Sequence, residues 1–511
     1  MWFLSGIVMM YVPFPSLTQQ ERLAGLAPID WKQVHGSVQA DAVLQQGLDG
    51  PVWLHDGAAA AMSGRAIAPV TARQAGGIAA AFGKAPASAV DLIERDQWTV
   101  GSGFNRYRPL WKVTLDRPDG LVLYVASTTG TVVLDTNRTE RFWNWLGSVP
   151  HWIYPTVLRQ DQPLWRQVIL WTSGASIIGA VSGMWIGVLR MRLRRRYKGG
   201  RISPYRGWQR WHHVTGLLGG TLLAAWIVSG WLSVDPNRWF ASTGLSDAAR
   251  AAYAGAAMPP RLDWQQVGST PQAAGARQMR LIWTDSTPLL IFSRPGGQDA
   301  ILDARSLKPV KLEPRRLIRA AHRLVPDARM EAADWLTKSD AYWYEAKGSV
   351  ELPVLRIRFA DMNGSWVYIS PRTGEVLRDM DARRRLYRWL FDGLHRWDFD
   401  VLIRQRPLWD IWMWLWLIIG AIISVSGIVI GMRRLWRPTD RRTSGIGGQR
   451  HQGNLVSNCA RAKHTLTPHG QCASNSDRRP VSRTLAIPGK KWCATQSRAN
   501  RSLPCISLIS S

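Results

Sequence analysis

The chain has 511 residues, a formal net charge of +29 and 29 tryptophans. Its mean hydropathy of −0.15 is not that of a typical membrane protein, but the apolar residues gather in three uncharged runs, Val168–Leu189, Val214–Val234 and Ile411–Met432. Each run exceeds the about 20 residues that a helix needs to span a bilayer. The pattern excludes a purely soluble protein, and the long polar stretches between the runs exclude a simple polytopic transporter.

The positive charge is concentrated beside the apolar runs. Arg190–Trp211 holds nine basic residues and no acidic one, and Pro438–Ser511 holds twelve basic and two acidic residues. Such flanks are typical of the cytoplasmic side of transmembrane helices, whereas a nucleic-acid-binding surface needs basic residues on a folded domain with aromatic platforms. We therefore expect the lipid bilayer as a partner and no nucleic acid.

The first predicted element is an apolar segment, residues 1–12, which ends before Pro13 and Pro15. Its eleven apolar residues, Trp2–Val12, are too few to span a bilayer. The segment also lacks the basic start and the small-residue cleavage site of a signal peptide. We expect it to be the second half of a truncated transmembrane helix whose first half is missing.

The rest of the chain alternates between polar regions and apolar helices. Two extracytoplasmic polar regions are predicted at residues 13–163 and 235–407. Transmembrane helices 2, 3 and 4 are predicted at residues 164–190, 212–234 and 408–432. A basic cytoplasmic loop, residues 191–211, joins helices 2 and 3. A basic tail, residues 433–511, has no sustained periodicity and is expected to be disordered in the cytoplasm.

Both polar regions are expected to have α+β folds. Apolar residues recur at helical spacing in Thr71–Phe82 and in Arg315–Val325. The segments that follow each helix alternate apolar and polar residues, which predicts strands with one buried face. These segments are Trp111–Asp116, Leu121–Ala126 and Thr131–Leu134 in the first region, and Val354–Phe359, Trp366–Ile369 and Glu375–Leu377 in the second.

An internal repeat is the strongest pattern in the sequence. With a shift of 244 residues, Arg141–Arg190 aligns with Arg385–Arg434 without a gap, and His151 aligns with His395. The chain is therefore predicted to be one duplicated unit of helix, polar region and helix. Other aligned pairs are Ser182-Gly183 with Ser426-Gly427 and, at a smaller shift, Trp2, Ser5 and Gly6 with Trp226, Ser229 and Gly230.

These patterns predict the fold class and the location. We expect an α-helical membrane protein with three complete transmembrane helices, a truncated first one and a two-fold internal repeat, carrying the two extracytoplasmic α+β regions. Each unit has two spans, so both copies have the same orientation and are related by a pseudo-two-fold axis along the membrane normal. The basic loop is then cytoplasmic and both polar regions lie in the periplasm of a bacterial inner membrane.

Several segments resemble a known family. Ser370–Leu377 resembles the PepSY domain, and Ala126–Val133 resembles it less closely. Trp211–Leu217, continuing to Ser229-Gly230, and Leu394–Trp397 resemble PepSY-associated transmembrane proteins. The resemblance covers roughly the chain up to Arg437. It implies domains that bind or restrain peptidases, iron-regulated membrane proteins and, in a few members, siderophore reductases that carry b-type haem between their helices.

Four histidines lie at the edges of the predicted spans: His151, His212, His213 and His395. They are either polar rings that favour the membrane interface or neutral imidazoles that ligate haem iron, with no other metal expected. The repeat predicts one outer haem site between His151 and His395. His212 and His213 point about 100° apart on a helix, so only one of them can face an inner haem. The partner in that inner site would precede residue 1.

Small residues at four-residue spacing, Gly179, Gly183 and Gly187, are predicted to form a helix-packing face. All four cysteines fall in the tail, at Cys459, Cys472, Cys493 and Cys505, so no thiolate metal site or disulfide is expected in the rest of the chain.

Catalytic motifs are absent from the sequence: it has no H-E-x-x-H, P-loop, G-x-S-x-G or strand-associated G-x-G-x-x-G. We expect no nicotinamide or flavin site and assign no catalytic residue. One hypothesis is a haem electron carrier that takes electrons from a quinol or a cytoplasmic donor and reduces a ferric siderophore. The alternatives are a non-enzymatic, membrane-anchored module that binds or regulates an extracytoplasmic peptidase, and a role in envelope assembly.

Overall fold

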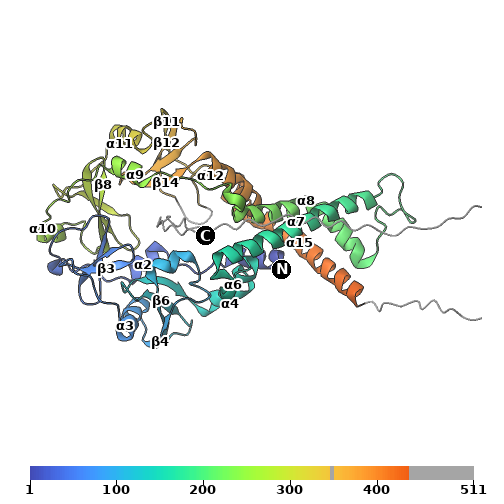
Figure 1. Ribbon diagram of the computed structural model, residues 1–511, viewed down its shortest axis with the longest axis horizontal. Coiled ribbons are helices and arrows are strands. Elements are labelled where there is room, and N and C mark those ends of the chain that lie inside the picture. The colour runs from blue at the N-terminus through green and yellow to red at the C-terminus, as the bar shows by residue number, and fades with distance from the viewer. Residues whose placement is uncertain (346–349, 437–511) are drawn as a thin grey trace, which may run out of the picture. The chain divides into compact units, whose positions relative to one another are not determined.

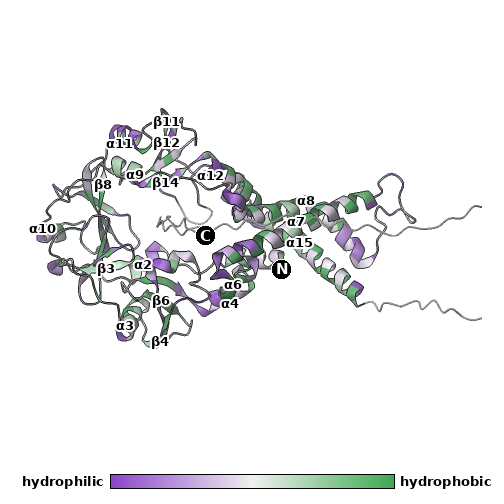
Figure 2. Cartoon of the chain, viewed as in Figure 1, coloured by the Kyte–Doolittle hydropathy of each residue, from purple (hydrophilic) through white to green (hydrophobic). Residues whose placement is uncertain are grey.

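The computed structural model describes residues 1–345 and 350–436 (Figure 1). Within these ranges, three helices are long and apolar enough to cross a membrane: α7 (Gln162–Arg190), α8 (Gly207–Ser233) and α15 (Arg406–Leu435). Figure 2 shows apolar residues along all three. Helix α8 packs against both α7 and α15. The tail was predicted to be disordered from residue 433, but residues 433–435 belong to α15. The rest of the predicted tail from residue 437 onward, with the four cysteines, lies outside the described residues.

Glycines allow close contact between the long helices, but only at one end of the predicted helix-packing face of α7. A Cβ atom on Gly187 of α7 would lie 3.1 Å from the side chain of Leu217 on α8. A Cβ atom on Gly179 or Gly183 would meet nothing within 4 Å. The prediction that all three glycines line one packing face is therefore wrong for Gly179 and Gly183, because no described residue covers that part of α7.

Helix α1 (Trp2–Tyr11) has ten residues, which corresponds to a length of about 15 Å. It packs against α15 and against the short helix α5 (Ser148–His151). A glycine is needed at Gly420 of α15, because a Cβ atom there would lie 2.6 Å from the ring of Phe3. This contact fixes α1 beside α15 and places its Ser5 next to His151.

Fourteen strands of the described residues form three antiparallel sheets, ordered β4-β5-β6-β7, β11-β12-β13-β14 and β10-β9-β8-β1-β2-β3. In the six-stranded sheet, β1 pairs with β8, so that Leu44 lies opposite Met279. The strands are β1 Val43–Gln46, β2 Pro51–His55, β3 Ala58–Ala61, β4 Ala87–Ile93, β5 Leu110–Leu115, β6 Val122–Ala126, β7 Val132–Thr136, β8 Gln278–Thr284, β9 Thr287–Ser293, β10 Ala300–Asp303, β11 Met330–Leu336, β12 Val354–Phe359, β13 Trp366–Ile369 and β14 Val376–Met380.

Short helices connect and cover the sheets. Helix α3 packs on the sheet that contains β4, β5 and β6, and it begins with a capping box between Thr71 and Gln74. The remaining α-helices are α2 Gln19–Gly25, α3 Ala72–Gly83, α4 Arg138–Leu146, α6 Thr156–Arg159, α9 Asp247–Ala254, α10 Trp264–Ser269, α11 Pro314–Ala321, α12 Ala382–Tyr387, α13 Leu394–Arg396 and α14 Asp400–Arg404. The segment η5, Arg388–Gly393, is a π-helical turn between α12 and α13.

The predicted fold class, an α-helical membrane protein with a two-fold repeat, is wrong. The structure is 44% helix and 19% strand, and its described part has three large antiparallel sheets and only three candidate spanning helices. The six-stranded sheet draws β1–β3 from the first half of the chain and β8–β10 from the second. The halves are therefore joined by backbone hydrogen bonds in one sheet and are not two separate copies of a helical unit. The prediction failed because the long apolar runs are the strongest pattern in the sequence, whereas the strands of this sheet are short and give a weak pattern.

The strands that were predicted are present, but their burial differs from the prediction. Strands β12 and β13 have the predicted bounds, and β5–β7 and β14 differ at their ends by one or more residues. Every residue of β6 is buried, although one exposed face was expected. The reason is a second apolar layer: Leu123 and Val125 pack on one side with Ala79 of α3, while Val122 and Tyr124 pack on the other with Trp98.

Candidate functional site

Two of the four predicted ligands, His151 and His395, lie next to each other with their rings in a T-shaped arrangement. His151 is the last residue of α5, and His395 is in α13; each precedes the first residue of a long helix by eleven positions. Their ring centroids are 6.1 Å apart, and the ring planes make an angle of 78°. His212 and His213, near the beginning of α8, do not join this pair.

Local structure fixes the backbone at each histidine. Helix α5 follows α4, where the Asn144 amide donates to the carbonyl oxygen of Pro13 at 2.9 Å and the Ser148 hydroxyl donates to the Asn144 side chain at 2.6 Å. On the other side, the π-helical turn η5 leads into α13, which ends at Trp397 with φ of 55°. Local π-helical geometry is frequent at functional sites because it re-aims side chains that a regular helix would carry elsewhere.

A serine from a second helix contacts Nδ1 of each imidazole. Nδ1 of His151 lies 3.1 Å from Oγ of Ser5, and Nδ1 of His395 lies 3.0 Å from Oγ of Ser229. The backbone carbonyl oxygen three residues before each serine lies 3.2 Å from the same nitrogen. A carbonyl oxygen only accepts hydrogen bonds, so Nδ1 carries the proton and Nε2 keeps its lone pair. We find no hydrogen bond to Nε2 of either ring within the described ranges.

The spacing of the rings fits two axial ligands of one metal ion. A metal–imidazole bond is about 2 Å long, and the ring centroid lies about 1 Å behind the nitrogen, so two opposed ligands have centroids about 6 Å apart. The observed centroid distance is 6.1 Å. Among the described residues, no group of three or more His, Cys, Asp or Glu side chains could hold a metal ion. A haem suits such a two-ligand site because the porphyrin supplies the equatorial nitrogens.

Both imidazoles are expected to be neutral at physiological pH. Burial lowers the pKa of His151 to about 4. Burial and the neighbouring His151 lower the pKa of His395 to about 3. Each side chain retains some accessible surface, although protein atoms enclose most of it. Neutral imidazole is the form that binds a metal, so the site needs no proton loss before a ligand bond forms at pH 7.

The surroundings of the pair are aromatic and apolar. The ring of Phe391 stacks on His395 at a centroid distance of 5.1 Å and an angle of 21°. A Cβ atom on Gly6 would lie 3.3 Å from Leu417 and 3.7 Å from the His151 ring, so the glycine lets α1 approach both. Trp226 and Leu417 belong to one buried apolar cluster of α1, α8 and α15. Low-polarity surroundings of this kind suit a macrocycle with an apolar body.

A buried ionic network adjoins His395. The Arg396 guanidinium lies 3.3 Å from both Asp392 and Asp398, and the hydroxyl of Tyr344 donates to Asp398 at 3.1 Å. Burial raises the pKa of Asp392 and of Asp398, while the nearby Arg396 opposes the rise. These charges fix the chain around α13, and they place ionisable groups on one side of the histidine pair.

His212 and His213 have separate surroundings. Nδ1 of His212 lies 3.1 Å from Oγ of Ser426 on α15. Nε2 of His213 donates to the carbonyl oxygen of Gly187 on α7 at 2.8 Å, and the ring packs edge-on against Tyr205. The expectation that the two rings point in different directions is confirmed, because they contact different helices. His212 has the same kind of contact as the outer pair, and His213 does not.

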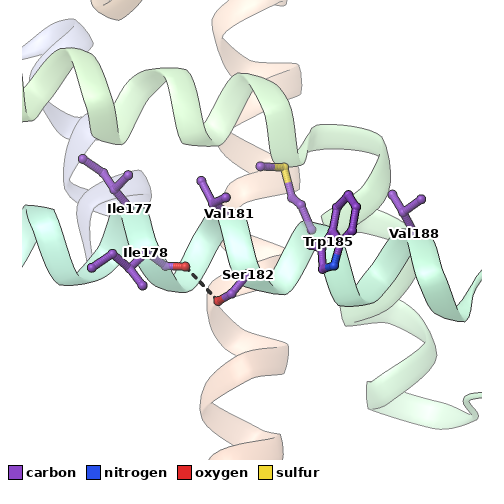
Figure 3. Close-up of a pocket in the computed structure, with 7 residues that line it drawn as sticks. Ile177, Ile178, Val181, Ser182, Trp185 and Val188 are labelled. Atoms are coloured by element: carbon purple, nitrogen blue, oxygen red, sulfur yellow. Dashed lines mark hydrogen bonds between the residues drawn. The ribbon is translucent and has the colours of Figure 1, made fainter.

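An apolar cavity of about 650 Å³ lies along α7. It is lined by residues of α7, including Ile178, Ser182 and Trp185 (Figure 3). The hydroxyl of Ser182 donates to the carbonyl oxygen of Ile178 in the same helix at 2.8 Å. Large apolar side chains on this face, such as Trp185 at 67% exposure, are accessible in the protein alone. The cavity offers an apolar surface without reactive groups.

The sequence analysis missed the serines that hold the imidazoles. Ser5, Ser229 and Ser426 are each followed by glycine, and each is almost fully buried. The signal was present, because these Ser-Gly pairs recur in the apolar segments. In the sequence, the Ser-Gly pairs indicate only the internal repeat, because a single sequence does not show which histidine contacts which serine.

Comparison with known proteins gives no family for this chain. No family model matches it, and no curated protein matches it. The resemblance to PepSY-associated transmembrane proteins therefore stays a prediction from the residues.

Proposed function

We propose that the chain is an integral membrane protein that holds a b-type haem between His151 and His395 and passes electrons to an acceptor outside the cytoplasm. The resemblance to siderophore reductases suggests a ferric siderophore as this acceptor, which would make the chain a haem-dependent ferric reductase. Haem, when bound, supplies one-electron redox chemistry. The chain's own residues orient the ligands, keep them neutral and exclude water.

One observation carries the proposal: the two imidazoles face each other at a centroid distance of 6.1 Å, with Nδ1 of each ring held by another helix. A purely structural histidine pair would gain hydrogen bonds by directing the free nitrogen to a protein donor. Here both Nε2 atoms keep their lone pairs, which favours ligation.

The shared sheet supports the proposed topology. Because β1 and β8 are hydrogen-bonded neighbours, the polar regions before α7 and after α8 would lie on the same side of a membrane that α7 and α8 cross. The basic segment between α7 and α8 then lies on the opposite side, which the positive-inside rule assigns to the cytoplasm. We propose a bacterial inner-membrane location with both polar regions in the periplasm, and a quinol or a cytoplasmic protein as electron donor.

The absorption spectrum of protein purified from haem-supplemented cells tests the proposal. We expect a Soret band that shifts on reduction, and a large loss of bound haem in His151→Ala and in His395→Ala. His322→Ala is the matched control, because His322 is exposed and distant in sequence from the pair. Its spectrum should equal that of the wild type.

A folded and colourless wild-type protein would contradict the haem proposal. It would favour the non-enzymatic alternative, a membrane-anchored module that binds or regulates an extracytoplasmic peptidase. Unchanged spectra in both alanine variants would also exclude His151 and His395 as the ligands.

A further inference from the structure

Three of the four span-edge histidines meet a Ser-Gly pair of another helix in the same arrangement. His151 contacts Ser5 of α1, His395 contacts Ser229 of α8, and His212 contacts Ser426 of α15, with Nδ1–Oγ distances of 3.1, 3.0 and 3.1 Å. In each case the carbonyl oxygen three residues before the serine lies 3.2 Å from the same nitrogen. A chance contact would not reproduce two distances at three separate places.

The direction of these hydrogen bonds follows from the helix backbone. Each serine hydroxyl is 3.0 Å from the carbonyl oxygen three residues earlier in its own helix, and it can only donate to that oxygen. The hydroxyl proton is thus used within the helix, and Oγ is left as an acceptor. Nδ1–H of the imidazole donates to it, so the serine selects the tautomer with a free Nε2.

We propose that Ser5 and Ser229 are positioning residues for the haem that His151 and His395 would hold: their hydroxyls accept from Nδ1–H of the two imidazoles, fixing the tautomer and the rotation of both rings. This inference rests on the proposed haem site. A hydrogen-bond acceptor on the far nitrogen orients a metal-ligating histidine and raises its basicity. A more basic ligand stabilises the ferric state relative to the ferrous state.

Ser182 is a similar serine that does not contact an imidazole. Ser182 also precedes a glycine on a long helix, but its hydroxyl donates to the carbonyl oxygens of Ile178 and Gly179 in the same helix, at 2.8 and 3.2 Å, and contacts no imidazole. Ser182→Ala therefore removes the same hydroxyl from the same kind of helix without touching a ligand, which makes it the matched control.

The test measures haem affinity and reduction potential in Ser5→Ala, Ser229→Ala and the double variant. We expect haem affinity to fall roughly 10- to 100-fold in each single variant, with a more positive reduction potential for the haem that stays bound. Ser182→Ala should match the wild type in both quantities. Ser229→Thr retains a hydroxyl and should restore the potential, which a loss of packing alone would not explain.

The outcomes separate this inference from the proposed function. If the wild type binds haem and both serine variants keep its affinity and potential, the positioning role is wrong while the haem site stands. If Ser182→Ala shifts the potential as much as Ser5→Ala, the effect is general to the helices and the positioning role is also wrong. If the wild type binds no haem, the proposed function itself fails.

Discussion

His395 has a more highly charged environment than His151, although the two rings face each other. Asp392, Arg396 and Asp398 lie around His395, and the side chain of Asp398 is only 3% exposed. The positions that align with them by the 244-residue shift carry the uncharged residues Ser148, Trp152 and Tyr154. The two imidazoles thus contact similar serines, but only His395 has an ionic network beside it. This network is expected to contribute to the stability of the fold.

Replacing Arg396 by Gln should destabilise the protein by about 3 kcal/mol. The substitution removes the cation that is paired with Asp392 and Asp398, whose side chains are 23% and 3% exposed. Breaking an ion pair with a buried carboxylate costs far more than the pair contributes. The control is Arg404→Gln, whose partner Asp400 is 55% exposed and whose loss should cost less than about 1 kcal/mol. Thermal unfolding in detergent measures both, and equal losses would show that the network is not buried in the way described.

At the scale of the elements, Asp135 in strand β7 is a carboxylate whose charged form destabilises the fold. Burial raises the pKa of Asp135 to about 6, and the nearby Glu21 and Glu140 add to the rise. The folded-state pKa lies above the unfolded value of 3.8. At low pH Asp135 is neutral, and its burial does not destabilise the fold. As the pH rises through 6 the group becomes charged in the folded protein, and the free energy of unfolding falls.

Asp135→Asn should therefore stabilise the protein above pH 6 but not at pH 4. The gain at pH 8 is expected to be on the order of 1–3 kcal/mol, seen as a higher unfolding temperature. Asp91→Asn, at an exposed position of the edge strand β4, is the control and should change little at either pH. A gain in Asp135→Asn that is equal at pH 4 and pH 8 would contradict the assigned cause.

The elements that the sequence predicted share a strong local pattern. The long helices follow from uncharged runs, and β12 and β13 from alternating residues between turn signals. Strands β1–β3 have weaker patterns, as in the four alanines of β3. The pairing of Val43 with Arg280 joins residues far apart in the chain, which no local pattern encodes. His151 and His395 were found because they align at the span edges, while their serine partners required the helix contacts.

For the whole molecule, the sheet shared by both polar regions has a topological consequence. Reporter fusions at Arg196, between α7 and α8, and at Gly297, between β9 and β10, should report opposite sides of the membrane. The helix α8 separates the two positions in the chain, and the proposed topology, in which the β1–β8 pairing would keep both polar regions on one side, predicts opposite signals. Alkaline phosphatase should be active at Gly297 and inactive at Arg196. The same signal at both positions would exclude the proposed arrangement.

The ferric electron paramagnetic resonance spectrum of the haem-loaded protein tests the central claim most directly. Imidazole planes at 78° are nearly perpendicular, and perpendicular axial imidazoles give a low-spin signal with one unusually large g value, whereas parallel planes give a rhombic signal. We predict the large-g signal in the wild type and its loss in His395→Ala. No low-spin signal in the wild type, or the same signal in His395→Ala, would contradict a haem held between His151 and His395.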